Sequence, residues 1–379
     1  MKLNFEHSTT QILDNQKIKA VKAYREVLIF GGGESGEWVR GLLESEGVCP
    51  KCYIDNYKPK QGTIKNGLMI MPFEEAIAKY EDACICIGSL WADEIIKQIR
   101  KYDPNLLDKT IDFRGAMVWE IKRKVFQSEE VDYIKQNITQ YDNLESKLFD
   151  AESKHVLSGI LNYRITRDWS YLKDIVCDGD EYVDKDIVPC TLFEEQRGEI
   201  IDGGAFDGDT VELFAERYNV DRLTIHCYEP SKVNANRIRE KKHLWRNLDV
   251  VVHESGLSVQ AGNGLLEGNG LGGTVEKTDT KRMNKDSILL ECIDDGRWDN
   301  LRLVKLDIEG AEIEALLGGV NSIKKCRPVL AICAYHKQDD LLKLADYIAC
   351  LENYRIYLRH YMNATSETIM YGVPEELFY

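Results

Sequence analysis

Short apolar runs alternate with longer amphipathic stretches in two separate parts of the chain. In the first part the apolar runs lie at 26–30, 52–54, 83–87 and 110–113, with helical patterns at 35–46 and 73–80. This alternation is typical of a parallel sheet covered by helices. Pro72 suits the start of the second helix. The pattern therefore predicts an N-terminal α/β domain over residues 1–115.

The same alternation returns further on and continues to the end of the sequence. Its apolar runs lie at 200–202, 223–228, 250–253, 301–306 and 329–334. Two β-rich runs, 354–359 and 367–373, follow on either side of the polar turn 363–366 and predict an antiparallel hairpin. Parallel sheets often carry such an antiparallel edge. We therefore predict a second α/β domain over residues 196–379.

Two stretches depart from this pattern. Residues 116–195 lack the apolar runs that predict strands, and amphipathic patterns at 131–147 and 152–163 predict helices. We therefore expect a helical connector. Residues 255–281 are dense in glycine, which excludes a long helix. Two interpretations of this glycine-dense stretch stay open, a turn-rich hairpin or a mobile flap over a ligand.

Composition narrows the classes of protein that the chain can belong to. The 49 Lys and Arg against 64 Asp and Glu give a net charge of −15, which disfavours nucleic acid as a partner. No apolar run reaches the roughly 18 residues of a membrane span, and the first residues lack a secretory signal. Eleven cysteines, an odd number, indicate reduced thiols in a cytoplasmic protein. The oligomeric state is not indicated.

The strongest chemical motif joins the strand 200–202 to a following helix. Its residues are Asp202-Gly203-Gly204-Ala205-Phe206-Asp207-Gly208-Asp209-Thr210. Glycines let a ligand approach the backbone, and a helix N-terminus favours an anionic group. At the end of the next strand, before Pro230, Glu229 can accept hydrogen bonds from two ribose hydroxyls. The two features together predict an adenosine cofactor.

The acid at the start of this loop favours one adenosine cofactor over another. A dinucleotide loop prefers Gly-x-Gly-x-x-Gly, whereas the acid Asp202 would repel a pyrophosphate. Asp202 suits the ammonium of a methionine moiety, directly or through water, which points to S-adenosyl-L-methionine. A plain strand-to-helix turn remains the structural alternative.

A third motif places charged residues at the end of the strand 301–306. Lys305, Asp307, Glu309 and Glu312 fall within eight positions. Because ligands of open α/β sheets bind at the carboxyl edge of the strands, we interpret this cluster as part of a site.

These motifs resemble the FkbM family of S-adenosylmethionine-dependent methyltransferases over about residues 182–374. The resemblance rests on the glycine loop at 202–210, which we call the cofactor loop, and on the segments 228–230 and 305–312. Closing motifs of a bacterial branch of the family resemble the segments 334–337 with Asp340, 358–361 and 367–368. The family implies a class I methyltransferase fold, which is Rossmann-like, with a seven-stranded sheet whose last strand is antiparallel. It also implies O-methylation of a hydroxyl on a sugar, glycan or secondary metabolite.

The resemblance assigns residues to the cofactor. They are Asp202, Gly203, Gly204, Ala205, Phe206, Gly208, Thr210, Glu229, Pro230, Ser255 and Asp307. Phe206 departs from the family pattern, because many members carry a small polar residue there.

Removing the proton of an alcohol requires a base. His336, after the run 329–334, is our candidate; Asp307 or Glu309 could serve instead or orient it, and Lys305 would organise these carboxylates. Two interpretations of His360 stay open: it lies at a solvated hairpin tip, or it contacts the substrate. We expect no metal ion, since Cys49 and Cys52 have zinc-ligand spacing without a suitable second pair.

A second glycine loop lies in the N-terminal domain. Gly31, Gly33 and Gly36 fit Gly-x-Gly-x-x-Gly, and Asp55 follows 55 − 36 = 19 positions later. The segment loosely resembles small Rossmann-like domains that bind nucleotides or nucleotide-sugars, and a purely structural domain is the alternative. Two rival functions stay open: an NAD-dependent sugar-modifying enzyme, and a non-catalytic nucleotide-sugar or S-adenosylmethionine-binding module of polysaccharide biosynthesis.

Overall fold

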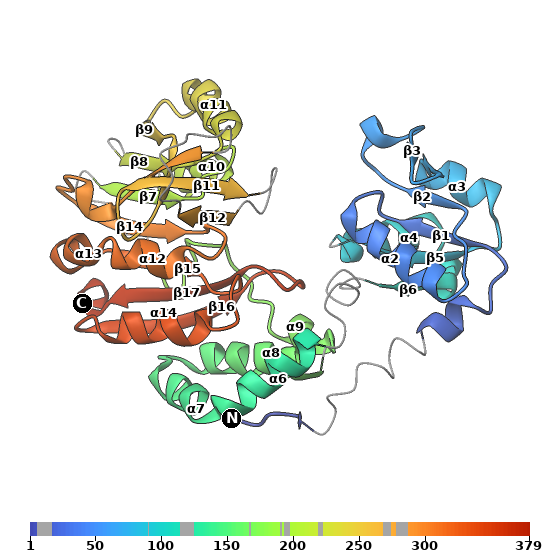
Figure 1. Ribbon diagram of the computed structural model, residues 1–379, viewed down its shortest axis with the longest axis horizontal. Helices are drawn as coiled ribbons and strands as arrows, with labels where there is room; N and C mark the ends of the chain where they lie inside the picture. The colour runs from blue at the N-terminus through green and yellow to red at the C-terminus, as the bar shows by residue number, and fades with distance from the viewer. Residues whose placement is uncertain are drawn as a thin grey trace. The chain divides into compact units, whose positions relative to one another are not determined.

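The structure is a computed structural model, and it divides the chain into two compact units (Figure 1). The larger unit comprises Met1–Lys2, Asn137–Leu161 and Trp169–Tyr379, and the smaller comprises Leu3–Gln136 and Asn162–Asp168. The structure describes residues 1–5, 17–89, 91–113, 125–166, 168–189, 192, 198–218, 223–267, 274–277 and 287–379. The predicted boundaries at 115 and 195 lie outside the described residues, so the three-part division remains a prediction.

The smaller unit is built on a six-stranded sheet with the order β3-β4-β2-β1-β5-β6. Its strands are β1 Val27–Phe30, β2 Cys52–Ile54, β3 Ile64–Lys65, β4 Leu68–Met71, β5 Cys84–Ile87 and β6 Thr110–Asp112. The helices are α2 Glu34–Ser45, α3 Phe73–Lys79 and α4 Ala92–Tyr102. All neighbouring strands are parallel except β3 and β4. The four predicted strands are present in this sheet.

The β3–β4 hairpin was missed by the sequence analysis. The two strands are joined by Asn66 and Gly67, whose φ angles are +48° and +80°. An Asn-Gly pair with two positive φ angles favours a tight two-residue hairpin turn. The signal was therefore present, but β3 is too short and too exposed to form an apolar run.

In the described residues after the sheet of the smaller unit, the helices are α6 Val125–Gln136, α7 Ile138–Lys147, α8 Ala151–Thr166 and α9 Ser170–Asp174. The continuous pattern predicted at 131–147 is interrupted at Asn137, which separates α6 from α7. Helix α6 and the end of α8 belong to the smaller unit, whereas α7 and most of α8 belong to the larger one.

The larger unit contains a seven-stranded sheet with the order β16-β17-β15-β14-β7-β8-β9 (Figure 1). Its strands are β7 Glu199–Gly203, β8 Leu223–Tyr228, β9 Leu248–His253, β14 Leu301–Leu306, β15 Val329–Cys333, β16 Tyr354–His360 and β17 Thr368–Pro374. The helices of this domain are α10 Asp209–Arg217, α11 Lys232–Lys241, α12 Glu312–Leu317, α13 Val320–Cys326 and α14 Asp340–Ala349. Strand β17 is antiparallel to both β15 and β16. The predicted fold, a seven-stranded sheet with an antiparallel last strand, is confirmed.

The strand order of this sheet determines where a ligand can bind. From β7 the chain proceeds to β8 and β9 on one side, and β14 and β15 lie on the other side. Such a reversal opens a crevice outside the carboxyl ends of the central strands. The glycine loop after β7 and the charged segment after β14 both lie at this edge.

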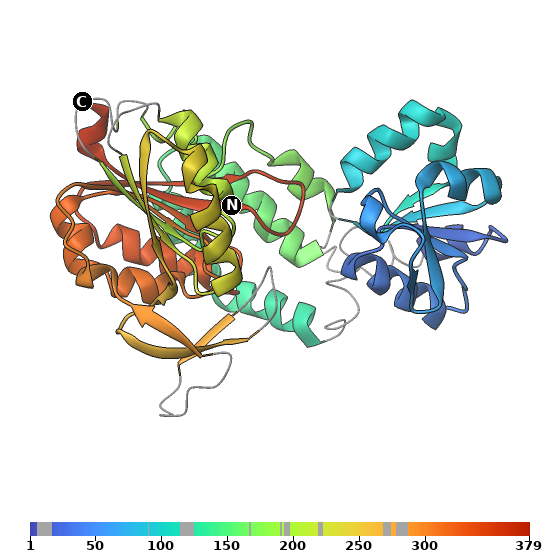
Figure 2. The same cartoon turned by 90° about the horizontal axis from the view of Figure 1, so that it is seen from above.

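The glycine-dense stretch contributes to a second, smaller sheet with the order β10-β13-β11-β12. Its strands are β10 Ser255–Leu257, β11 Gly262–Glu267, β12 Thr274–Lys277 and β13 Ser287–Glu291. Figure 2 shows this sheet set apart from the seven-stranded one. Strands β11 and β12 pair antiparallel, as the hairpin interpretation predicts. Gly268, Gly270, Gly272 and Gly273 lie outside the described residues.

The central strands of the larger unit are buried on both faces, which explains their nearly continuous apolar runs. Charged side chains are buried there too: Lys305 in β14 is only 2% exposed, and Asp202 in β7 is fully buried. The ten cysteines in the described part of the chain are free thiols. Within the described residues, no helix combines the length and apolar character that crossing a membrane requires.

Candidate active site

The loop after β7 turns sharply beside the end of β14. Gly204 has a φ of +74°, and a Cβ atom there would lie 1.8 Å from the carbonyl oxygen of Asp307. Gly208, with a φ of +89°, would place a Cβ 2.6 Å from the ring of Trp245. Glycine is therefore required at both positions because the backbone is left-handed and the neighbouring atoms are too close for any side chain.

A buried ion pair connects this loop to β14. The Nζ of Lys305 lies 3.0 Å from Oδ1 of Asp202, and the two side chains are 2% and 0% exposed. Lys305 also donates hydrogen bonds to the carbonyl oxygens of Gly203 and Gly204, at 3.1 and 2.8 Å. Lys305 therefore holds the cofactor loop, and its carboxylate partner is Asp202.

Burial raises the pKa of Asp202, and Lys305 opposes this shift. Burial also lowers the pKa of Lys305, but Asp202 and Asp307 outweigh it and raise that pKa above its ordinary value. The acid that the sequence assigned to the ammonium of a methionine moiety is thus already neutralised by a lysine of the same chain.

Glu229, at the end of β8, is brought against the same loop. Its Oε2 accepts a hydrogen bond from the backbone N–H of Phe206 at 3.0 Å, and its Oε1 accepts one from Ser231 at 2.8 Å. Burial raises the pKa of Glu229, although these hydrogen bonds lower it. Each carboxylate oxygen can accept a second hydrogen bond. Glu229 therefore retains the capacity to bind two hydroxyls.

The other residues assigned to the cofactor lie around this corner. The backbone N–H groups of Gly204 and Ala205 donate to the carbonyl oxygen of Tyr228. Thr210 is in the first turn of α10. Ser255 begins β10 and is fully buried, and its Oγ has no hydrogen-bond partner among the described residues. A buried hydroxyl without a partner favours an additional polar group at this point.

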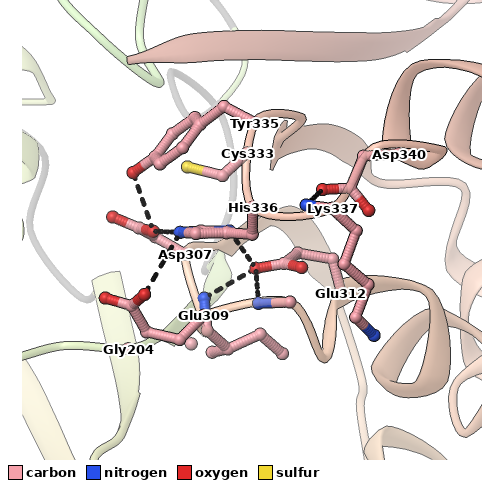
Figure 3. A network of polar contacts seen from close by, with 12 residues as sticks. Gly204, Asp307, Glu309, Glu312, Cys333, Tyr335, His336, Lys337 and Asp340 are labelled. Atoms are coloured by element: carbon pink, nitrogen blue, oxygen red, sulfur yellow. Dashed lines mark hydrogen bonds and ion pairs between the residues drawn. The ribbon is translucent and has the colours of Figure 1, made fainter. Parts of the chain in front are cut away.

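His336 lies beyond β15, between carboxylates on both sides of its ring (Figure 3). Its Nδ1 is 2.9 Å from Oε1 of Glu312. Its Nε2 is 3.4 Å from Oδ1 of Asp307 and 3.6 Å from Oε2 of Glu309. Burial lowers the pKa of His336, but Glu312, Asp307 and Glu309 outweigh it and raise the pKa to about 8. The structure thus brings together the three residues that the sequence considered for the base.

Glu312 holds both this histidine and the loop that precedes α12. Its Oε1 accepts hydrogen bonds from the backbone N–H groups of Ile308, at 2.9 Å, and Gly310, at 3.2 Å. Glu309 and Gly310 have positive φ angles of +56° and +96°. A non-glycine residue in this conformation is strained, and the Glu312 carboxylate stabilises the turn that requires it.

Two tyrosine hydroxyls hold the carboxylate of Asp307. Tyr335 donates to Oδ1 and Tyr182 donates to Oδ2, each at 3.2 Å. The sequence analysis missed both. Tyr335 could have been found, because it adjoins His336 in the segment that resembles the family, whereas no local pattern distinguishes Tyr182.

Asp307, Glu312 and His336 also place one ligand-type atom each within 4.8 Å of one another. The imidazole ring lies between the two carboxylates, with Nδ1 facing Glu312 and Nε2 facing Asp307. The distances are those of an imidazole in ion-pair range of carboxylates on both sides, with Glu312 the nearest at 2.9 Å.

His360 is buried, 1% exposed, and its Nδ1 lies 2.9 Å from Oγ1 of Thr368. Burial lowers its pKa to about 4. The interpretation of His360 as a solvated hairpin tip is wrong, because the ring packs inside the β16–β17 hairpin.

In the smaller unit, the loop between β1 and α2 has the geometry that its glycines predict. A Cβ at Gly31 would lie 2.2 Å from the carbonyl oxygen of Gly88, and one at Gly36 would lie 1.7 Å from that of Gly31. Gly33, by contrast, has no atom within 4 Å of its Cβ position. Asp55 accepts a hydrogen bond from the Gly32 N–H at 3.0 Å. Packing thus explains the first and third glycines but not Gly33.

The sheet order and the site at its carboxyl edge define the class of this protein. A glycine loop and a ribose-type acid lie on one side of the strand-order reversal, and a carboxylate–histidine cluster follows β14 and β15 on the other. This is the arrangement of a class I methyltransferase.

The sequence comparison agrees with this class. Residues 202–356 match the methyltransferase FkbM domain. This segment is similar to the FkbM family of methyltransferases, and the similarity supports the methyltransferase class. Among proteins of curated function, none matches the sequence.

A solved structure supports this fold. The crystal structure of methyltransferase FkbM from Methylobacillus flagellatus KT is similar over 97% of this chain and 98% of its own, with a TM-score of 0.60 and 20% identity. An rRNA methylase from Streptococcus thermophilus is similar over 52% of this chain and 99% of its own, with a TM-score of 0.33 and 10% identity.

Proposed function

We propose that this protein is an S-adenosylmethionine-dependent O-methyltransferase whose acceptor is a hydroxyl of a sugar, a glycan or a secondary metabolite. The observation that supports this most directly is the position of His336, with Nδ1 on Glu312 and Nε2 facing Asp307 and Glu309. An alcohol is a weak nucleophile until its proton is removed, and this imidazole is placed to remove it.

The residues around the cofactor loop fit an adenosine cofactor. Glu229 would bind the ribose hydroxyls, the turn at Gly204 would admit the ligand to the backbone, and Ser255 would provide a hydroxyl that lacks a partner among the described residues. S-adenosylmethionine would supply an electrophilic methyl group beside the carboxyl ends of β7 and β14.

The chain's own groups would then act mainly by position. Methyl transfer is an in-line displacement, so the alignment of the acceptor oxygen provides much of the acceleration. Glu312 would keep a proton on Nδ1 of His336, which leaves Nε2 to accept the proton of the acceptor hydroxyl. Asp307 and Glu309 would orient that hydroxyl and stabilise the imidazolium that forms. The electron pair of the breaking carbon–sulfur bond remains on sulfur.

Calorimetric titration of the full chain tests the cofactor. We expect saturable binding of S-adenosylmethionine and S-adenosylhomocysteine, and loss of both on Glu229→Ala. Glu254→Ala removes a carboxylate whose contact is with Arg239 at the surface and should leave binding unchanged. Binding of NADH to the larger unit in place of the S-adenosyl ligands would refute the proposal.

Turnover tests the chemistry. Transfer of a labelled methyl group to a panel of sugars, oligosaccharides and polyols should yield an alkali-stable methyl ether with the wild-type protein and much less with His336→Asn. Equal turnover of the two proteins would refute the base assignment. Cofactor binding without transfer to any hydroxyl acceptor, but with transfer to amines, would refute O-methylation.

We propose separately that the loop from Gly31 to Gly36 binds a nucleotide or nucleotide-sugar. The open space at Gly33 and the adjacent carboxylate of Asp55 support it, because a phosphate and a ribose would occupy these places. Glu34 and Glu37 in the first turn of α2 oppose a phosphate, so a weak interaction is expected. Titration with UDP, ADP and UDP-glucose, repeated with Gly33→Val, tests this; no heat with any of them would refute it.

A further inference from the structure

Tyr182 lies outside the matched segment 202–356, yet its side chain reaches the centre of the candidate site. It is 6% exposed and adopts a φ of +62°, which is unfavourable for a tyrosine. Backbone strain of this kind persists only where the surrounding contacts hold it. The contacts of Tyr182 join the two halves of the site.

We propose that Tyr182 is a positioning residue that fixes the carboxylate of Asp307 through its hydroxyl and covers the Asp202–Lys305 pair with its ring. This rests on the proposed function, because Asp307 faces the histidine that we assign as the base. Residue 182 precedes the segment 202–356 that matches the family model, so this role would come from a part of the chain in front of that segment.

The hydroxyl has one strong acceptor. It donates to Oδ2 of Asp307 at 3.2 Å and lies 3.6 Å from Sγ of Cys333, which is a weak hydrogen-bonding atom. Tyr335 holds the other oxygen, Oδ1, at the same distance. With a donor on each oxygen the carboxylate cannot rotate freely, and Oδ1 stays 3.4 Å from Nε2 of His336.

The ring makes a second, independent contact. The Nζ of Lys305 lies 5.2 Å from the centroid of the Tyr182 ring, within the range of a cation–π interaction. Lys305 in turn holds Asp202 and the carbonyl oxygens of the cofactor loop. A single residue therefore contacts both the cofactor side, through its ring, and the acceptor side, through its hydroxyl.

These two contacts can be separated by substitution. Tyr182→Phe removes the hydroxyl and keeps the ring, whereas Tyr182→Leu removes both. A carboxylate that loses a hydrogen-bond donor becomes a stronger base and stabilises a neighbouring imidazolium more. Loss of the hydroxyl should therefore make His336 more basic, while loss of the ring should loosen the cofactor loop.

The test uses the full chain with ¹⁵N-labelled histidine, saturated with S-adenosylhomocysteine, and follows the ring nitrogens of His336 by NMR through a pH titration. The signal is identified by its loss in His336→Asn. Charged and titratable groups that act on His336 are unchanged in every tyrosine variant; they are Asp307, Glu309, Glu312, Asp340 and Glu367.

We expect Tyr182→Phe to raise the pKa of His336 by about half a unit, with affinity for S-adenosylhomocysteine within about twofold of wild type. Tyr335→Phe should act in the same direction. Tyr182→Leu should in addition weaken S-adenosylhomocysteine by about tenfold. Tyr354→Phe is the matched control, because it deletes a hydroxyl bonded to the carbonyl oxygen of Pro328 and should change neither quantity.

An unchanged His336 titration in Tyr182→Phe would overturn the proposal, as would a loss of cofactor affinity in Tyr182→Phe equal to that in Tyr182→Leu. Failure of the wild-type chain to bind S-adenosylhomocysteine would instead refute the proposed function. The titration of His336 could then still be compared without ligand, so the two failures are distinguishable.

Discussion

Lys305→Met leaves Asp202 as a buried carboxylate without its cation. Methionine has a similar length, so packing in β14 is largely kept while the ion pair and two hydrogen bonds to loop carbonyls are lost. Removing one partner of a buried pair costs about 3–5 kcal/mol. For a unit of this size that loss corresponds to a fall of about 10 °C in its melting temperature.

Differential scanning calorimetry of the full chain measures this loss. The unfolding of the smaller unit serves as an internal reference, because Lys305 lies in the larger one. Lys324→Met, at an exposed position on α13, controls for the loss of a lysine charge. The double variant Asp202→Asn with Lys305→Met should recover a large part of the stability, since it leaves no buried charge.

The deficit of Lys305→Met should also depend on pH. Without its cation, Asp202 has a folded-state pKa far above its unfolded value, because burial already raises it in the wild type. A carboxyl group raised in this way costs little while it is protonated, and stability is lost as the pH rises toward the folded pKa. The deficit should therefore be smaller at acidic than at neutral pH. A loss below about 1 kcal/mol, the range of an exposed pair, would refute the reasoning.

Three further predictions follow from the site. His336→Asn should lower kcat by about 10²–10⁴-fold with little change in S-adenosylhomocysteine affinity. In the wild type, kcat measured against pH should rise through about pH 8 and level off above it, because Nε2 must be unprotonated and the pKa of His336 is raised to about 8. A flat pH profile of kcat would contradict this assignment. Glu229→Gln should weaken S-adenosylhomocysteine by about 10–100-fold in calorimetric titration, because hydrogen bonds to a charged acceptor are lost; an unchanged affinity would place the ribose elsewhere. Gly204→Ala should destabilise the larger unit by more than about 2 kcal/mol in calorimetry, because its Cβ would meet the carbonyl oxygen of Asp307; a stable variant that binds the cofactor normally would show that the loop can move.

The class of this protein could be predicted from the sequence because each cue is local. Apolar runs place β7, β8, β14 and β15, and the glycine loop and Glu229 follow directly from the strand ends that precede them. Since parallel strands end at one edge of the sheet, the sequence could also predict that Lys305 to Glu312 and His336 lie near the cofactor loop.

Local patterns failed where an element is short or where the partner is distant along the chain. Strand β3 is too short to form an apolar run, and the interruption at Asn137 occurs inside a continuous helical pattern. His360 looked like part of an exposed turn because its burial depends on packing within the β16–β17 hairpin.

The sequence by itself determined the two α/β patterns, the cofactor-type loop and the cluster of charged residues after β14. Only the tertiary structure decided how those charges are paired: Lys305 with Asp202, Glu312 with His336, and Tyr182 with Asp307, 125 positions away. The reason is physical. Burial makes an unpaired charge costly, so each buried group takes the partner that folding brings to it, and sequence spacing does not determine that partner.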